Sequence, residues 1–98
     1  MPNAIVINVI EVTEGREDAA LTAWEAFAEY FRRQPGYVST KLHRAVGADA
    51  RFRFINVAEW ESADDFLSAL KSPGLADVSP GAPEQVNFFT SIYEVIRS

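Results

Sequence analysis

The chain has 98 residues, of which 48% are hydrophobic, and its formal net charge is −5. This length allows one domain around one hydrophobic core, so we expect residues 1–98 to form a single domain. The acidic balance argues against binding to nucleic acid or to an anionic membrane surface, and the absence of cysteine excludes disulfides and thiolate catalysis.

The first predicted element is a strand from Ala4 to Val12, which reads AIVINVIEV. Its β-branched and almost continuously apolar sequence is typical of a central strand with both faces covered. The residues before it lack a basic region and a cleavage-site pattern, and no apolar run approaches about 18 residues. We therefore expect a cytoplasmic protein that does not associate with membranes.

Thr13 to Gln34 is predicted to form a long amphipathic helix. Acidic residues open this segment, and Arg32 and Arg33 close it before Pro35-Gly36. Its apolar residues recur at helical spacing, namely Ala20, Trp24, Phe27, Ala28 and Phe31.

Two strand-like runs follow, Tyr37 to Val46 and Arg51 to Trp60, and residues 47–50 join them. Such a short connection is typical of an antiparallel hairpin. The run Arg51 to Trp60 reads RFRFINVAEW.

Ser62 and Asp65 have the spacing of a capping box, which predicts a second helix that carries Phe66. The proline- and glycine-rich segment Ser72 to Pro83 predicts a loop with one helical turn around Leu75. Val86 to Ile96 predicts the last strand.

The predicted order is βαββαβ, which indicates an α+β fold of ferredoxin-like topology with the first and third strands side by side. Strand alternation places Asn8, Phe52, Phe54, Asn56 and Trp60 on the face that the helices cover. The opposite face would expose an apolar patch on a monomer, which soluble proteins avoid. We therefore expect a homodimer that stacks two sheets through Ile5, Ile7, Val9, Ile55 and Val57.

Asn56 stands inside an otherwise apolar and aromatic strand, four residues before Trp60. Asparagine is depleted in strand interiors, and a buried amide without partners costs about 1–3 kcal/mol. A bound ligand is one explanation for Asn56, and a hydrogen bond within the protein is the other. Asn8, near the middle of the neighbouring strand, would project into the same space beneath the helices.

At these residues the sequence resembles the antibiotic biosynthesis monooxygenase family. The resemblance extends over nearly the whole chain and is most specific in FINVAEWESADDF, with further support from VINVIEV and the QPGYVS turn. It implies a dimeric α+β barrel of ferredoxin-like topology.

The resemblance also implies an activity. Cofactor-independent oxygenases of this family convert polyaromatic anthrones or quinols to quinones with dioxygen, and they use an N-x-x-x-W motif that Asn56 and Trp60 match. Asn8 matches an asparagine that some of them use in the first strand. The implied catalytic residues are thus Asn8, Asn56 and Trp60, with a small aromatic substrate, dioxygen, no cofactor and no metal.

Aromatic side chains are the candidates for substrate binding, although core packing would use the same residue types. They are Trp24, Phe27, Phe31, Phe54 and Phe66. Phe66 replaces a tyrosine of one such enzyme, and residues 70–83 contain no arginine to match another of its residues. These two departures keep open a non-catalytic dimeric barrel that binds an aromatic ligand.

Haem degradation is a third and less favoured hypothesis. Haem-degrading members share the first-strand asparagine, but their helix tryptophan and histidine ligand align with Ala69 and Val78. The sole histidine, His43, is predicted to lie on a wetted strand beside Lys41 and Arg44, and we assign it no role.

Overall fold

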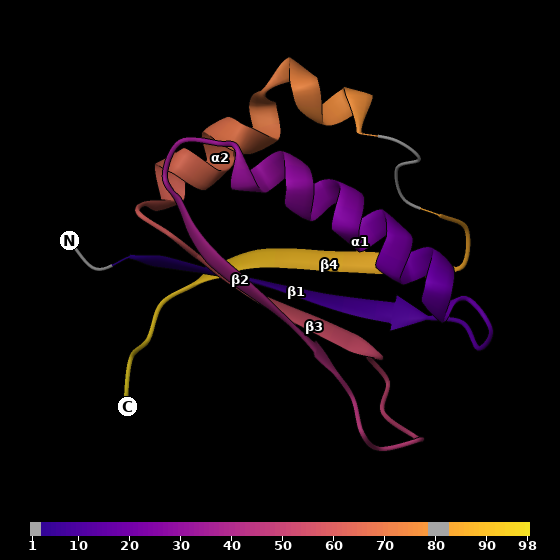
Figure 1. Ribbon diagram of the computed structural model, residues 1–98. Helices are drawn as coiled ribbons and strands as arrows, with labels where there is room; N and C mark the ends of the chain where they lie inside the picture. The colour runs from indigo at the N-terminus through magenta and orange to yellow at the C-terminus, as the bar shows by residue number, and fades with distance from the viewer. Residues whose placement is uncertain (1–2, 79–82) are drawn as a thin grey trace.

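The computed structural model describes residues 3–78 and 83–98. The predicted βαββαβ order is confirmed, and both helices cover the same face of the sheet (Figure 1). The elements are β1 Ala4–Val12, α1 Glu17–Arg32, β2 Tyr37–Arg44, β3 Phe54–Trp60, α2 Ala63–Lys71, the 3-10 helix η1 Pro73–Asp77, and β4 Val86–Tyr93. This is the ferredoxin-like α+β fold that the sequence predicts.

The four strands form one antiparallel sheet in the order β2-β3-β1-β4. The predicted pairing of the first and third strands is confirmed, and β1 lies between β3 and β4. In this register Asn8 is directly opposite Asn56. The two carboxamides therefore leave the sheet side by side on the same face.

The helix α1 begins at Glu17, later than the predicted Thr13. Gly15 has a φ of +90°, and the N–H of Arg16 donates to the carbonyl oxygen of Thr13 at 3.0 Å. Residues 13–16 therefore form a turn, because the left-handed conformation of Gly15 cannot continue an α-helix.

The second helix begins as predicted, with Ser62 as its N-cap. The backbone N–H of Asp65 donates to Ser62 Oγ at 3.1 Å. The side chain of Asp65 lies against Gly36, whose φ is +88° and where an added Cβ would collide with that carboxylate. Gly36 therefore lets the start of β2 approach the first turn of α2.

The predicted hairpin is present, but its connection is longer than expected, from residue 45 to residue 53. The guanidinium of Arg53 donates to the carbonyl oxygen of Ala45 at 3.0 Å, and the backbone N–H of Arg53 donates to Ile10 at 3.0 Å. Phe52 stacks at 6.2 Å on Phe89, whose strand partner Val9 belongs to the face away from the helices. The prediction that Phe52 lies on the helix-covered face is therefore wrong.

The last strand ends at Tyr93, before the predicted Ile96. The helical turn predicted around Leu75 is confirmed as η1, while residues 79–82 of the predicted loop lie outside the described residues. Within residues 3–78 and 83–98, no helix is both long enough and apolar enough to cross a membrane.

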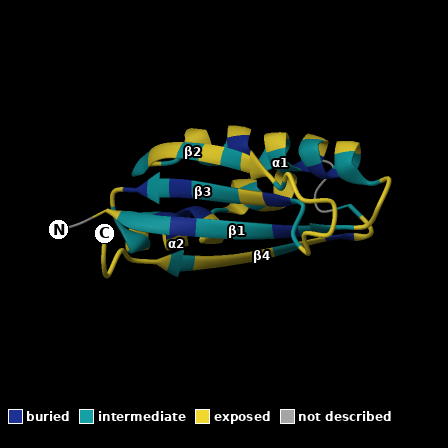
Figure 2. Ribbon diagram, turned by 90° about the horizontal axis from the view of Figure 1, so that it is seen from below, coloured by how far each residue is buried: buried dark blue, intermediate teal, exposed yellow. Residues whose placement is uncertain are grey.

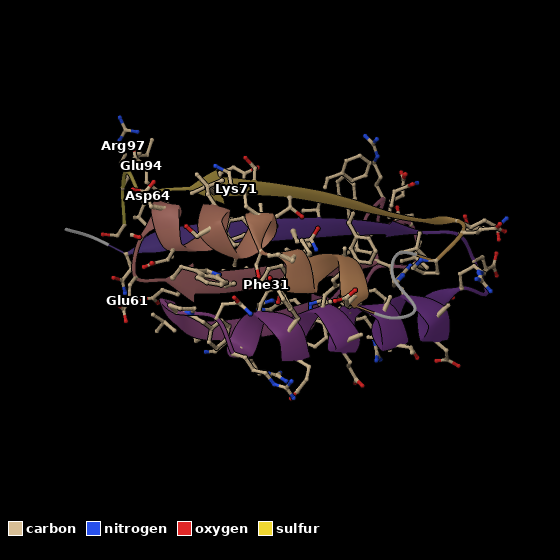
Figure 3. The ribbon with its side chains drawn as sticks, turned by 90° about the horizontal axis from the view of Figure 1, so that it is seen from above. Phe31, Glu61, Asp64, Lys71, Glu94 and Arg97 are labelled. Carbon is tan, nitrogen blue, oxygen red and sulfur yellow. The ribbon has the colours of Figure 1, made fainter. Side chains whose placement is uncertain are left out.

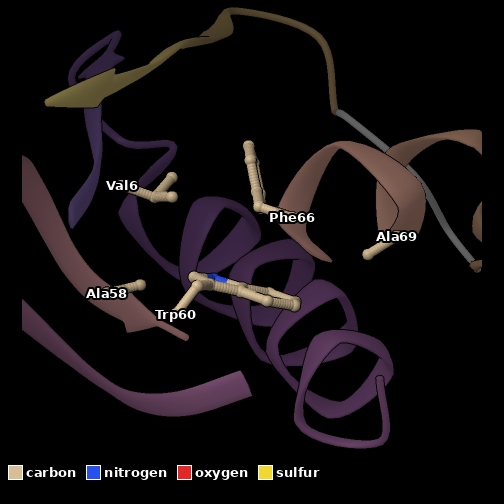
Figure 4. Close-up of a cluster of buried hydrophobic side chains, with 5 residues drawn as sticks. All are labelled: Val6, Ala58, Trp60, Phe66 and Ala69. Atoms are coloured by element: carbon tan, nitrogen blue, oxygen red, sulfur yellow. The ribbon is translucent and has the colours of Figure 1, made fainter. Parts of the chain in front are cut away.

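Two apolar clusters hold the helices on the sheet. Figure 4 shows the first cluster, which comprises Val6, Ala58, Trp60, Phe66 and Ala69. The second comprises Ile10, Ala20, Phe54 and Val86. Along β1 and β3, Asn8 and Asn56 fall between these clusters, so a pair of amides interrupts the core.

The opposite face of the sheet carries no helix (Figure 2). We call it the open face, and it presents Ile5, Ile7 and Val9 of β1, which are half-buried, together with Ile55, Val57, Phe89 and Tyr93. Phe89 and Tyr93 are 49% and 51% exposed. Within the single chain, β1 is thus covered on one face only, and the expected dimer stays a prediction.

Candidate active site

Two adjoining pockets lie between the sheet and the helices, and we call them the inner and the outer lobe of the cavity. The inner lobe has a volume of about 70 Å³. Its sheet wall is formed by Val6, Asn8, Thr40, Asn56, Ala58 and Trp60. Its helix wall is formed by Trp24, Phe27, Ala28, Phe31 and Phe66.

The outer lobe is larger, about 200 Å³, and more open to solvent. It shares four bordering residues with the inner lobe, namely Asn8, Trp24, Phe27 and Phe31. Its remaining walls come from Leu70, Leu75, Phe88 and Thr90. Asn8 therefore stands where the two lobes meet.

The two carboxamides have different surroundings. Thr40 Oγ1 donates to Asn56 Oδ1 at 2.6 Å, which fixes the plane of the amide and leaves its Nδ2 without a partner among the described residues. Asn8 Oδ1 is buried, and no group in residues 3–78 and 83–98 donates to it. A buried acceptor without a hydrogen-bond donor lowers the stability of the fold by about 1–3 kcal/mol. A ligand that donates a hydrogen bond to it would recover this free energy.

Trp60 belongs to the core and to the cavity at once. It is 1% exposed, and its ring centroid lies 6.0 Å from that of Phe31 and 5.7 Å from that of Tyr37. The ring of Phe66, drawn with Trp60 in Figure 4, lies 5.4 Å away. Edge-to-face packing on three sides holds the indole in one orientation at the border of the inner lobe. Its N–H has no hydrogen-bond acceptor within the described part of the chain.

The structure thus brings together the residues predicted to be catalytic: Asn8, Asn56 and Trp60 all border the inner lobe. Of the predicted substrate-binding residues, Trp24, Phe27, Phe31 and Phe66 also border it. Phe54 does not, because it is buried in the cluster of Ile10, Ala20 and Val86. The expectation that Phe54 contacts a ligand therefore has no support from its position.

Sequence reasoning missed Thr40, whose hydroxyl orients Asn56. A signal was available, because alternation along β2 places Thr40 and Leu42 on the same face as the amides. The reasoning also missed the small residues Ala28 and Ala58, which leave the inner lobe empty.

None of the described residues that border either lobe is ionisable. In Figure 3, Phe31 points into the space between the helices, whereas the labelled charged residues lie outside that space, in the left half of the view. His43 is exposed on β2, and its Nδ1 lies 3.2 Å from the carbonyl oxygen of Ile55. It borders a shallow hollow on the open face, on the other side of the sheet from the cavity.

The site therefore offers amide and indole groups in apolar surroundings. Residues 3–78 and 83–98 contain no group of three or more His, Cys, Asp or Glu side chains that could hold a metal ion. What these side chains can do is accept and donate hydrogen bonds to a molecule that is otherwise apolar.

The sequence profile of antibiotic biosynthesis monooxygenases matches residues 3–79. The chain belongs to this family. No curated protein matches the sequence.

Among solved structures of similar fold is a candidate monooxygenase from Shewanella loihica PV-4. It is 32% identical, covers 98% of this chain and 96% of its own, and has a TM-score of 0.85. SnoaB, a cofactor-independent oxygenase from Streptomyces nogalater, is 22% identical over 100% of this chain and 97% of its own, with a TM-score of 0.81. The haem degrader MhuD from Mycobacterium tuberculosis is 23% identical over 97% of each chain, with a TM-score of 0.72.

The last two identities establish a common fold and leave the substrate open. The family resemblance sets Ala69 and Val78 against the helix tryptophan and the histidine ligand of haem-degrading members. Ala69 is 3% exposed and packs in the first apolar cluster, and Val78 follows η1 directly. Neither side chain can ligate iron.

Proposed function

We propose that this family member is a cofactor-independent monooxygenase that oxidises a planar polyaromatic anthrone or quinol to a quinone with dioxygen. The observation that carries the proposal is the convergence of Asn8, Asn56 and Trp60 on one cavity, which no ionisable side chain of residues 3–78 and 83–98 borders. Such a site suits a substrate that supplies its own electrons and needs only orientation and hydrogen bonds.

The chemistry follows from the substrate. An anthrone has an acidic methylene conjugated to a ketone, and loss of one proton to solvent gives an enolate. The amide N–H of Asn8, which borders both lobes, donates to the oxygen that carries this charge. The charge is delocalised over the rings, so the apolar walls of Trp24 and Phe27 are compatible with it.

The enolate gives one electron to dioxygen, and the resulting radical and superoxide combine to form a carbon–oxygen bond. The peroxide takes up a proton. Departure of the second methylene hydrogen as a proton then breaks the oxygen–oxygen bond and releases water. One oxygen atom stays as the new carbonyl, and the other leaves in the water. Trp60 N–H and Asn56 Nδ2 are the donors available to the oxygen that gains charge.

The two lobes limit how the substrate binds. Ligand pockets for molecules of drug size usually measure about 300–1,000 Å³. The inner lobe of about 70 Å³ and the outer lobe of about 200 Å³ are each smaller than this range. A tricyclic substrate therefore occupies the outer lobe and extends between Leu70 and Leu75, and Leu70 is 41% exposed.

The test is oxygen uptake with anthrone in air, in the presence of a metal chelator and without flavin. We expect the wild-type protein to consume oxygen faster than buffer and faster than Trp60→Phe, which retains an aromatic ring but lacks the N–H. Wild-type uptake that does not exceed that of Trp60→Phe would contradict the proposal.

A second candidate function is a non-catalytic barrel that binds an aromatic ligand. The observation that favours it is Phe66, whose ring packs at 5.4 Å on Trp60 and brings no hydroxyl to the inner lobe. Quenching of the fluorescence of Trp24 and Trp60 by anthrone, without oxygen uptake, would favour this function over catalysis.

We also propose that the protein is a homodimer that pairs its open faces. The support is the apolar surface formed by β1 and β3, including Ile55, which is 37% exposed. Pairing two such faces would bury an apolar patch, and soluble monomers rarely expose an apolar patch of this kind.

A further inference from the structure

The two lobes of the cavity differ in what they can admit. An apolar cavity of about 150 Å³ in another protein binds one molecule of benzene. The inner lobe, at about 70 Å³, is less than half that size, whereas the outer lobe, at about 200 Å³, exceeds it. No aromatic ring fits the inner lobe, but a molecule of two atoms does.

We propose that the inner lobe is a binding chamber for dioxygen, separate from the outer lobe that holds the rings of the substrate. This inference rests on the proposed function and assigns each co-substrate its own space. The reacting carbon then lies at the junction of the lobes, beside Asn8, which borders both.

The walls of the inner lobe suit an apolar gas. Ala28 of α1 and Ala58 of β3 face the space from opposite sides, and Val6 of β1 adds another short side chain. All three are at most 7% exposed. Any longer apolar side chain at Ala28 or Ala58 would fill the space, so the emptiness follows from residue size.

The polar groups of the inner lobe can stabilise superoxide, the product of electron transfer to dioxygen. Asn56 Nδ2 and the indole N–H of Trp60 have no hydrogen-bond acceptor in the described part of the chain, and both residues border this lobe. Dioxygen accepts hydrogen bonds poorly, whereas superoxide is an anion. The two donors therefore stabilise the reduced oxygen more than the neutral molecule, which favours the transfer.

The hydrogen bond from Thr40 strengthens this assignment. Thr40 Oγ1 donates to Asn56 Oδ1 at 2.6 Å, so the group of this amide that is left to bind oxygen is its Nδ2 N–H. Asn8 Oδ1, in contrast, is a buried acceptor without a partner. Where the two lobes adjoin, Asn8 Oδ1 can accept a hydrogen bond from a phenolic hydroxyl of the substrate. This bond would place the phenol group next to the reacting carbon.

The first test measures the two Michaelis constants separately. Ala58→Val, and Ala28→Val as a second variant from the opposite wall, should raise KM for dioxygen about tenfold or more and leave KM for anthrone within about twofold. Ala26→Val is the matched control in α1, because Ala26 borders neither lobe, and it should change neither constant. A rise in KM for anthrone with an unchanged KM for dioxygen would overturn the chamber.

The second test does not depend on turnover. Crystals of the wild-type protein under xenon pressure should hold a xenon atom in the inner lobe, and crystals of Ala58→Val should lack it. Xenon only in the outer lobe, or ordered water filling the inner lobe, would overturn the assignment. A wild-type protein that binds xenon here but consumes no oxygen with anthrone would instead contradict the proposed function and leave the apolar chamber established.

Discussion

Thr40 offers the sharpest test of how the site is built. Its hydroxyl donates at 2.6 Å to Asn56 Oδ1 in part-buried surroundings. Thr40→Val keeps the volume and the β-branched shape but removes the donor, so Asn56 Oδ1 loses its partner. A buried acceptor left alone costs about 1–3 kcal/mol, and we expect the free energy of unfolding to fall by that amount.

The effect on turnover should be larger than a stability change alone can produce. Without the hydrogen bond, the Asn56 amide can rotate, and its N–H is no longer held toward the cavity. A loss of about 1–2 kcal/mol of transition-state stabilisation corresponds to a fall of about 5- to 30-fold in kcat. KM for anthrone should change little, because Thr40 does not border the outer lobe.

Thr40→Ser is the matched control. It keeps the hydroxyl and removes one methyl group, so it should lose up to about 0.8 kcal/mol of stability while kcat stays within about twofold of wild type. The assays are oxygen uptake at saturating anthrone and urea unfolding of all three proteins. If Thr40→Val kept the wild-type kcat, or if Thr40→Ser lost as much kcat as Thr40→Val, the positioning role of Thr40 would be refuted.

The remaining predictions concern the core, the open face, the turn and the pH profile. Trp60→Ala should lower the free energy of unfolding by about 3–5 kcal/mol in urea titrations because three rings lose their packing partner, and a loss below about 1 kcal/mol would contradict this. Ile7→Lys places a charge opposite Val57 on the open face and should convert a dimer into a monomer in light scattering, whereas a monomeric wild type would contradict the dimer itself. Gly36→Ala should cost more than about 1 kcal/mol because of its φ of +88° and the collision with Asp65, and unchanged thermal unfolding would argue against that contact. Because none of the described residues that border the cavity is ionisable, kcat should rise with pH as the substrate ionises, and anthrones of different acidity should shift the profile. A pH profile common to all of them would indicate a protein base.

The parts of the fold that the sequence predicted are those that hydrophobic periodicity controls. The alternation in β1 and β3 places Asn8 and Asn56 on one face, and the structure pairs them directly. The N-cap at Ser62 was equally visible, because a hydroxyl three residues before a carboxylate has a local geometric consequence. The first inference needed only the two-residue period of a strand, and the second needed only residues close together in the sequence.

The errors arose where distant groups decide the outcome. At the end of the connection between β2 and β3, the guanidinium of Arg53 donates to the carbonyl oxygen of Ala45, and its backbone N–H donates to Ile10 of another strand. No local pattern reveals such bonds. Phe52 consequently turns to the open face, although alternation from Phe54 placed it with the site.

The sequence was sufficient to predict the polar residues of the site, but it was not sufficient to predict the volume of the cavity. Asn8, Asn56 and Trp60 stood out because amides and indoles are unusual in a core strand. The size of the inner lobe depends on how Phe31, Trp60 and Phe66 pack against one another, which is a three-dimensional property. Phe54 lies outside the inner lobe for the same reason, since an aromatic residue two positions along a strand can belong to a different cluster.

The confinement of charge to the exterior has a consequence for how this protein can change over time. The chain carries nine basic and 14 acidic residues, and none of the described ones borders either lobe. Substitutions that reset its isoelectric point, solubility or electrostatic steering can therefore accumulate without disturbing the reacting atoms. Such a scaffold can be adapted to new cellular surroundings independently of its chemistry, and laboratory redesign of its surface has the same freedom.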